Sequence, residues 1–496
     1  MKTVSTLPKI VVELDSEALP PAAARALEEI TVREELSQPS MCELYFASLP
    51  VECLPWPGAK LSVRINENGT MLFAGEVTAV EYVRRSEGER VVRVRAYDAL
   101  QELRRKHSLR AYKKMSAAGL AREMTASLGI QVSTNDEGPV WPALIQHNQS
   151  DFDFLRTIAR RSGLFYFLRG ETLHLIALNG LEDEVELQLG DTLLEGSVEV
   201  NTAFASGTVS VSAWDALRAE SHKGEAATAR TLLESNFTAG NDNLVLLANR
   251  NAGNDAEAAA MAQAELDLRR ARTAVLSGVA EGNACLHPGL RVKVHGFPEK
   301  LPSRFVLTSV IHRISKLTGF ISEISTRPQE PEHVPEGAIL ACGIVSDVQD
   351  PEKLGRVRLT LPAVGGVETD WLEVVAHGAG SGKGFLYLPS VDDKVAALFA
   401  REDLSVGIVL GGLFGADGLD DYGVDEKVVR FALLTPGGHK LRFDDSKKSL
   451  RMESPTGSYV EFTPEKVSLY SSCDMEITAP GRKMMIGAQA IDFKRL

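Results

Sequence analysis

The glycine-rich segment of residues 378–384, GAGSGKG, is the part of the chain that most resembles a phosphate-binding loop. A Walker-type loop needs glycine where this chain has His377, and Ser or Thr where it has Gly384. The next residues, FLYL at 385–388, predict a strand rather than a helix whose N-terminus would hold phosphate. We therefore expect a flexible loop and no nucleotide site.

A second group with apparent chemistry is an acidic cluster that resembles the paired carboxylates of a glycosidase. Its members are Asp417, Asp420, Asp421, Asp425 and Glu426. The cluster lacks a full calcium-loop pattern. Residues 414–429 are also too few for an inserted lysozyme-sized domain. We expect a solvated loop or, as the alternative, a weak cation site.

Histidine and cysteine do not form a recognisable site either. His287, His295 and His312 fall in one predicted β region, where core or surface histidine is the default and a metal site the alternative. The sequence has no G-x-S-x-G and no H-E-x-x-H motif. Its five cysteines include no C-x-x-C pair, which indicates free thiols in a reducing compartment. We expect no catalytic residue, no metal and no cofactor.

Charge and hydropathy exclude further classes. A net charge of −13 argues against a general binder of nucleic acid or anionic membranes. Residues 336–415 hold 6 Lys/Arg against 11 Asp/Glu, which disfavours a single-stranded nucleic-acid groove. Residues 1–14 lack a long apolar stretch, and no segment approaches a membrane span. We expect cytoplasmic synthesis without a signal peptide, and export only within a finished particle.

Residues 1–335 predict a mainly β region with some α. Period-two alternation indicates strands at residues 9–14, 41–46, 60–65, 71–83, 90–97, 164–169, 172–178, 274–279, 291–294, 304–314 and 320–326. Helices are indicated at residues 98–105, 116–127, 151–161 and about 255–273. Ser150 is a good N-cap for the third helix, and Asn254 or Asp255 caps the fourth.

A proline-rich stretch, residues 328–335, predicts a stiff linker and a domain boundary. Six short strands are then expected at residues 338–345, 355–361, 371–375, 385–388, 394–399 and 407–413. Such spacing favours a small barrel, with the OB-fold as first choice. We predict four regions, namely residues 1–335, an OB domain at 336–415, an acidic linker at 416–430 and a repeat region at 431–496.

The repeat region carries a short strand about every eight residues. The strand cores begin at residues 441, 450, 459, 467, 475, 484 and 491. A single ladder of this kind leaves an apolar face and two edges uncovered, so several copies of the chain are expected to wrap together. The side chains predicted to form the core between copies are Leu441, Phe443, Leu450, Val460, Phe462, Val467, Leu469 and Ile477.

Near the end of the chain, apolar side chains predict a docking face for another protein, with a membrane-inserting tip as the alternative. They are Met484, Met485, Ile486, Ile491 and Phe493. So short a patch cannot span a bilayer, which favours docking.

Two motifs resemble a known family. Residues 146–155, QHNQSDFDFL, resemble the Q-x-N-Q-S-D-x-x-F-L signature of VgrG-type spike proteins. Residues 355–358 (GRVR) and 371–374 (WLEV) are similar to the OB domain of that family. The matching residues are Gln146, Asn148, Gln149, Ser150, Asp151, Phe154, Leu155, Gly355, Arg356, Val357 and Trp371. The resemblance covers nearly the whole chain in order.

This resemblance implies the central spike of a contractile injection machine. It implies a homotrimer whose hub (residues 1–335) docks a hexameric inner tube, whose OB domains form a collar, and whose repeat regions intertwine as a β-helix needle. Implied partners are the inner tube, other baseplate or hub proteins, a PAAR-type tip protein, effector cargo and, on firing, the target envelope. Nucleic acid is not among them.

Two questions stay open at this point. An extracellular or phage-tail-like particle is favoured over a type VI secretion spike. An envelope-degrading enzyme and a glycan-binding tail module are the rival functions. The absence of an inserted catalytic domain argues against the enzyme.

Overall fold

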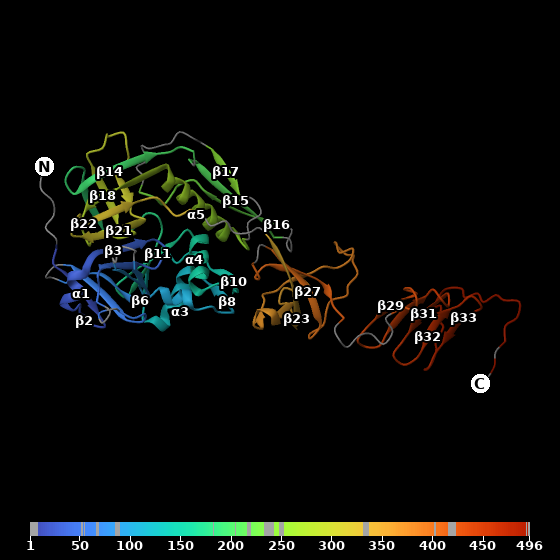
Figure 1. Cartoon of the computed structure of the whole chain (residues 1–496). Helices are drawn as coiled ribbons and strands as arrows, with labels where there is room; N and C mark the ends of the chain where they lie inside the picture. Colours follow the sequence, from blue (N-terminus) through green and yellow to red (C-terminus); the bar gives the residue numbers. More distant parts are fainter. Residues whose placement is uncertain are drawn as a thin grey trace. The chain divides into compact units, whose positions relative to one another are not determined.

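The computed structural model describes residues 8–496 apart from residues 51–52, 54, 66–68, 85–89, 182, 204, 216–219, 233–242, 248–251, 331–336, 401–402, 415–422, 493 and 495–496. It divides into two compact units, Met1–Gly412 and Leu413–Leu496 (Figure 1). Strands dominate both units, which confirms the predicted mainly β fold class.

The largest sheet of the first unit is curled and has eleven strands, in the order β14-β18-β22-β21-β3-β4-β7-β6-β5-β1-β2. Its strands are β1 (Ile10–Leu14), β2 (Glu17–Ala18), β3 (Leu27–Glu35), β4 (Met41–Ala47), β5 (Lys60–Ile65), β6 (Thr70–Arg84), β7 (Arg90–Tyr97), β14 (Leu193–Val200), β18 (Ala274–Glu281), β21 (Ser309–Ser315) and β22 (Gly319–Ser325). The two halves of the sheet meet where β3 pairs antiparallel with β21. The short helix α1 (Pro21–Ala26) precedes β3.

Alternation along β7 explains the two faces of this sheet. Val92, Val94 and Ala96 are fully buried in the core. Arg93 and Arg95 point the other way and form ion pairs with carboxylates of the neighbouring strands β6 and β4. The polar face is therefore held by exposed ion pairs, each worth at most about 1 kcal/mol, and the apolar face carries the stability.

A helical layer covers the middle of the first unit. It comprises α2 (Gln101–Arg105), α3 (Ala117–Thr125), the 3₁₀ turn Ala126–Leu128 and α4 (Asp151–Arg161). These pack with the pair β8 (Arg110–Met115) and β10 (Trp141–Gln146) and with the sheet β11 (Phe165–Arg169), β12 (Thr172–Ile176) and β9 (Gln131–Thr134). Their shared core includes Leu120, Phe154, Tyr166 and Leu173.

Two small sheets complete residues 8–330. One contains β13 (Glu184–Gln188), β19 (Arg291–His295) and β20 (Arg304–Val306). The other contains β15 (Thr208–Asp215), β16 (Glu220–Ala226) and β17 (Leu244–Leu247), against which the long helix α5 (Asp255–Thr273) packs. The predicted single strand at residues 304–314 was wrong, because Leu307 and Thr308 separate β20 from β21.

The OB domain follows as a six-stranded sheet with its own core around Val345 and Phe399. Its elements are β23 (Ala338–Asp347), β24 (Arg358–Leu361), a 3₁₀ turn (Pro362–Val364), β25 (Val367–Glu368), β26 (Glu373–Val374), β27 (Lys394–Ala400) and β28 (Gly407–Gly412). The predicted strand at residues 385–388 was wrong. That segment is exposed and makes no ladder.

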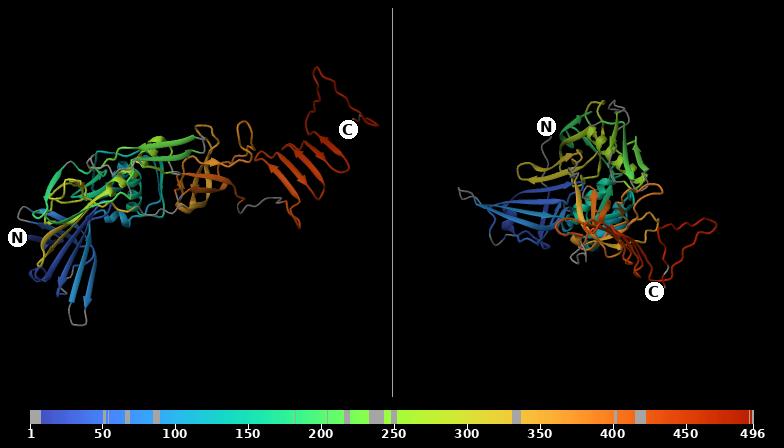
Figure 2. Two further views of the ribbon diagram at one scale, coloured as in Figure 1. Left: turned by 90° about the horizontal axis from the view of Figure 1, so that it is seen from above. Right: turned by 90° about the vertical axis from the view of Figure 1, so that its right-hand side faces the viewer.

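The second unit contains one antiparallel meander of five strands in sequence order, the C-terminal sheet. Its strands are β29 (Arg430–Leu434), β30 (Lys440–Asp444), β31 (Ser449–Glu453), β32 (Tyr459–Phe462) and β33 (Val467–Tyr470). Figure 2 shows them side by side in a single layer. Beyond Tyr470 the described residues form no strand, so the strands predicted from residues 475, 484 and 491 were wrong for the single chain. Pro480, Gly481 and Gly487 interrupt this stretch, and it pairs with no other strand among the described residues.

Candidate functional site

The first motif, residues 146–155, builds the turn between β10 and α4. Gln146 is fully buried, and its Nε2 donates to Asp151 Oδ1 at 2.8 Å while Tyr112 donates to its Oε1 at 3.2 Å. Its Nε2 also reaches the carbonyl of Gln149 at 3.4 Å. Asn148 is exposed and left-handed, with a φ of 49° that asparagine tolerates. The motif is therefore a buried polar network with a tight turn.

The same motif starts helix α4. Ser150 Oγ accepts a hydrogen bond from the backbone N–H of Asp153 at 3.1 Å, which confirms the predicted N-cap. Phe154 and Leu155 then enter the main core. None of these groups faces an open cavity with a nucleophile or a base, so their part is to fix the course of the chain.

The strand before this turn also joins the hub to the OB domain. Ile145 is 5% exposed and belongs to the OB core rather than to the hub core. Lys113 pairs with Glu368 at 3.3 Å, and Arg161 pairs with Asp403 at 3.5 Å. The joint thus places one buried side chain and two ion pairs between the two regions of the first unit.

The second motif organises the first loop of the OB domain. Gly355 has a φ of 77°, and Arg356 binds the Asp350 carboxylate through Nε at 3.1 Å and a terminal nitrogen at 2.7 Å. Asp350 also accepts from the backbone N–H groups of Glu352 and Leu354. These bonds, led by the Arg356 guanidinium, hold the pKa of Asp350 well below its usual range.

The rest of this motif completes the barrel wall. Val357 is buried and exchanges backbone hydrogen bonds with Leu372. Trp371 is half-buried, and its ring lies 4.8 Å from the Arg358 guanidinium. Both motifs are therefore structural.

In the rest of the described chain, histidine and acidic side chains do not come together in one site. His312 is buried between Ser322 Oγ and the carbonyl of Leu286, and His287 contacts the carbonyl of Pro288. Burial lowers the pKa of His287. Asp425 pairs with Arg430, while Asp417, Asp420 and Asp421 lie outside the described residues. Within the described part of the chain, no three His, Cys, Asp or Glu side chains form a metal site.

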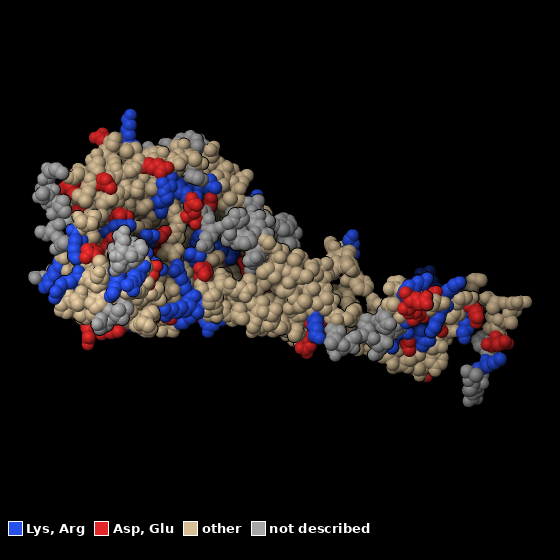
Figure 3. Space-filling view, viewed as in Figure 1, with Lys and Arg blue, Asp and Glu red and all other residues tan. Residues whose placement is uncertain are grey.

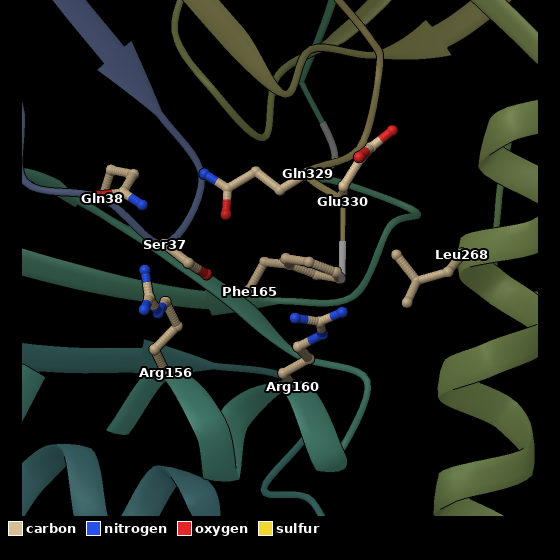
Figure 4. Close-up of a pocket in the computed structure, with 8 residues that line it drawn as sticks. All are labelled: Ser37, Gln38, Arg156, Arg160, Phe165, Leu268, Gln329 and Glu330. Atoms are coloured by element: carbon tan, nitrogen blue, oxygen red, sulfur yellow. The ribbon is translucent and has the colours of Figure 1, made fainter. Parts of the chain in front are cut away.

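A small cavity of about 150 Å³ lies between α4, α5 and the start of the linker (Figure 4). Arg156 and Arg160 rise into it from α4, with Phe165 between them. Gln329 reaches across to the Glu35 carboxylate and the carbonyl of Leu36. Ser37 and Glu330 both line the cavity, but the Glu330 carboxylate points away from Ser37 in Figure 4, and Glu330 is the only carboxylate among the lining residues that the structure describes, so we assign the cavity no catalytic chemistry.

The most distinctive surface is one face of the C-terminal sheet. Cross-strand register aligns Phe431, Phe443, Leu450, Phe462 and Val467 in one row. Two residues along each strand lies a second row, formed by Leu433, Leu441, Met452, Val460 and Leu469. We call these ten side chains the apolar face. None of the ten is buried, and Val467 and Leu469 are 66% and 62% exposed.

The opposite face of the same sheet is polar. Arg442, Arg451, Glu453 and Glu461 lie there, and the Arg451 guanidinium sits 3.9 Å from the Tyr459 ring. Tyr459 and Tyr470 stack with centroids 5.3 Å apart. The sheet therefore has one apolar face and one polar face, and the described residues of its own chain leave the apolar face uncovered.

Seven of the eight predicted core residues share this apolar face. The eighth, Ile477, lies beyond the sheet and is 64% exposed. Phe431, Leu433 and Met452 also lie on the face and were not predicted, although the alternation in residues 430–434 and 449–453 indicates them. The predicted docking residues Met484, Met485, Ile486 and Ile491 are all exposed on irregular backbone, and Phe493 lies outside the described residues.

Exposed large apolar side chains are distributed very unevenly. Among the described residues, ten lie in residues 8–330, thirteen in residues 337–414 and fifteen in residues 423–492. Figure 3 agrees, because charged side chains of both signs cover the hub while the visible face of the OB domain is almost free of them. Large exposed apolar surface marks an interaction site. The carboxyl-terminal third of the chain therefore carries the main candidate interfaces.

No helix among the described residues is long and apolar enough to cross a membrane. A search of curated proteins found no match. The family model described as the phage tail baseplate hub (GPD) matches residues 33–318. The model described as the type VI secretion system/phage-baseplate injector OB domain matches residues 341–414.

Solved structures share the fold at low identity. This chain matches one chain of the lidded PdpA-VgrG complex of Francisella at TM-score 0.58 and 11% identity. The match covers 93% of this chain and 80% of that one. The E. coli c3393 protein, a type VI secretion component with similarity to the T4 tail proteins gp27 and gp5, matches at TM-score 0.53 and 12% identity, covering 81% and 99%. A 43 kDa tail protein of prophage MuSo2 from Shewanella oneidensis matches at 0.50 and 15%, covering 64% and 97%. With the hub model matching more than half of its residues, the chain belongs to the phage tail baseplate hub family.

Proposed function

We propose that this protein is a non-enzymatic homotrimeric spike of a contractile injection machine. In this proposal the hub docks the inner tube and the other baseplate proteins. The C-terminal sheets of three copies assemble into the needle that punctures the target envelope. A PAAR-type tip protein binds the exposed apolar residues 484–491, and effector cargo travels with the spike.

The apolar face of the C-terminal sheet is the observation that carries this proposal. Fully burying an aliphatic or aromatic side chain is worth about 1.5–3 kcal/mol, so ten uncovered positions represent a large unrealised stabilisation. Three such sheets packed around one axis would cover all three faces and leave their polar faces in solvent. Intertwined strands would also leave no free edge, which suits a rod under axial load.

Two machines are candidates. We favour an extracellular or phage-tail-like particle, because the described sheet has only five strands and makes a short needle. A type VI secretion spike is the second candidate, supported by the fold shared with the PdpA-VgrG chain over 93% of this sequence.

Solution mass tests the proposal directly. Light scattering after size exclusion should give about three times 53.8 kDa for the full chain. The full-length oligomer should also resist dissociation by SDS. A chain ending at Val429 should contain fewer copies per particle and should not resist SDS. A stable full-length monomer would refute the trimeric needle.

The rival functions have their own tests. Clearing of cell-wall material in a zymogram by the purified protein would establish an envelope-degrading enzyme instead. Specific hits on a glycan array would establish a glycan-binding tail module.

A further inference from the structure

The small cavity between α4, α5 and the start of the linker has a lining that suits binding rather than catalysis (Figure 4). Arg156 and Arg160 stand one turn apart on α4, and both line it. Two like charges at this spacing on a helix repel each other. An anion placed between the two guanidinium groups would relieve that repulsion, so the pair indicates an anion-binding site.

The carboxylates near the cavity are engaged with other groups or face away from it. Asp153 contacts Arg156 at 3.1 Å, and its side chain is 47% exposed on the helix surface. Glu35 accepts a hydrogen bond from Gln329 Nε2 at 2.9 Å. Glu330 is exposed, and its carboxylate points out of the cavity in Figure 4. Among the described lining residues, two guanidinium groups therefore face the cavity and no carboxylate opposes them inside it.

The neutral polar side chains of the lining are held in place by the rest of the hub. Ser37 is buried, and its backbone N–H donates to the carbonyl of Tyr166 at 2.6 Å. Its φ of 56° is left-handed, a strained conformation for serine of the kind that persists at functional positions. Gln38 accepts a hydrogen bond from the Arg104 guanidinium. The lining is therefore preorganised, which lowers the cost of binding a ligand.

The remaining lining is apolar and narrows the class of anion. Phe165 and Leu268 are both buried and form an apolar wall of the cavity. Guanidinium groups bind carboxylate and phosphate through paired hydrogen bonds. A phosphate turns polar oxygens in all directions and would leave some of them unpaired against this wall, which is unfavourable. A carboxylate on a short aliphatic chain matches both parts of the lining.

We propose that this cavity binds the carboxylate of an aliphatic acid, with its oxygens between Arg156 and Arg160 and its carbon chain against Phe165 and Leu268. The acid is either a free small molecule or an acidic side chain or carboxyl terminus of a partner polypeptide, since all of these present the same chemistry. A guanidinium carries five N–H donors, so each arginine can hold such a ligand and keep its contacts within the chain. This inference does not depend on the proposed function.

Ligand-observed NMR by saturation transfer, with the full-length protein, tests the site. The probe is butyrate, and butyramide is its uncharged counterpart of nearly the same shape. So small a ligand should bind with a Kd on the order of 1 mM. Arg160→Gln removes one of the two guanidinium charges. The matched control is Arg122→Gln, at an arginine of α3 that is 49% exposed and pairs with Glu137 outside the cavity.

We expect Arg160→Gln to raise the Kd of butyrate at least about tenfold, because it removes a charge-assisted hydrogen bond. Arg122→Gln should leave the Kd unchanged, and butyramide should not bind. The inference is overturned if butyrate fails to bind, if butyramide binds as well as butyrate, or if Arg160→Gln binds butyrate as tightly as the unchanged protein. Comparing the two probes needs only the unchanged protein, so the test holds even if Arg160→Gln does not fold.

Two short peptides then distinguish the sources of the carboxylate. Acetyl-Ala-Glu-Ala-amide offers an acidic side chain, and acetyl-Ala-Ala-Leu offers a chain end. Displacement of butyrate by either peptide supports the site and assigns it to a partner polypeptide. Displacement by neither, with butyrate bound as expected, supports the site and assigns it to a free small acid.

Discussion

Substituting Val460 by aspartate tests the assembly of the C-terminal sheet most directly. Val460 lies in the second row of the apolar face, between Met452 of β31 and Leu469 of β33. In the single chain it is half-buried, so the substitution should cost the isolated fold little. In an assembled needle the new carboxylate would be enclosed by apolar side chains from neighbouring copies.

The size of the effect follows from burial. Losing the transfer of one valine costs about 1.5 kcal/mol, and an unpaired buried charge costs several kcal/mol more. Taking about 4 kcal/mol per copy, three copies lose about 12 kcal/mol. Since about 1.4 kcal/mol is a tenfold change, the association constant should fall by about nine orders of magnitude.

The matched control is Ala432→Asp. It places the same charge on the polar face of the sheet, opposite Arg442. Light scattering at micromolar concentration should give a monomer for Val460→Asp and an unchanged oligomer for Ala432→Asp. An unchanged oligomer for Val460→Asp, or equal dissociation of both variants, would show that the apolar face is not the interface.

Three further predictions concern other parts of the chain. Burial raises the pKa of Asp98 to about 7. The protonated carboxyl therefore stabilises the fold fully below about pH 4, and this contribution is lost as the pH rises through 7. Calorimetry should show a flatter pH dependence of Tm for Asp98→Asn than for the unchanged protein. Asp350→Asn should destabilise the OB domain by about 2 kcal/mol in urea unfolding, whereas Glu352→Gln, at an exposed partner of the same arginine, should cost less than about 1 kcal/mol. Deleting residues 484–496 should leave the oligomer intact and abolish pull-down of a PAAR-type tip protein, so retained binding would place the docking site elsewhere.

Local signals predicted part of the fold well. The predicted bounds of α4, β5 and β7 are the observed ones, because each combines strong alternation or helical periodicity with a clear boundary residue such as Ser150. Strand β3 was missed although it is central to the large sheet. Its sequence, LEEITVREE, is rich in glutamate, which is depleted from strands, and only pairing with β4 and β21 makes it one.

Prediction of the candidate interfaces was limited in the same way, because local sequence patterns do not reveal long-range contacts. Alternation alone placed seven side chains on one face of the C-terminal sheet. It could not distinguish the apolar run at residues 385–388 from a strand, since both are short and apolar. The buried network of Gln146 depends on Tyr112, 34 residues earlier in the chain, and no local pattern predicts that contact.

The distribution of apolar surface separates the chain into a part that is complete alone and a part that is not. In the hub, side chains such as Phe46, Phe152 and Tyr166 are fully enclosed by their own chain. In the C-terminal sheet none of the ten apolar-face residues is buried, although their pattern is as regular as that of any core strand. An apolar face left in water forgoes the free energy that its burial would contribute, about 25 cal/mol per Å² of apolar surface. In the proposed homotrimer, the C-terminal sheets of the other copies would cover this apolar face, because a second copy presents an equally apolar surface to the strict alternation of this sequence.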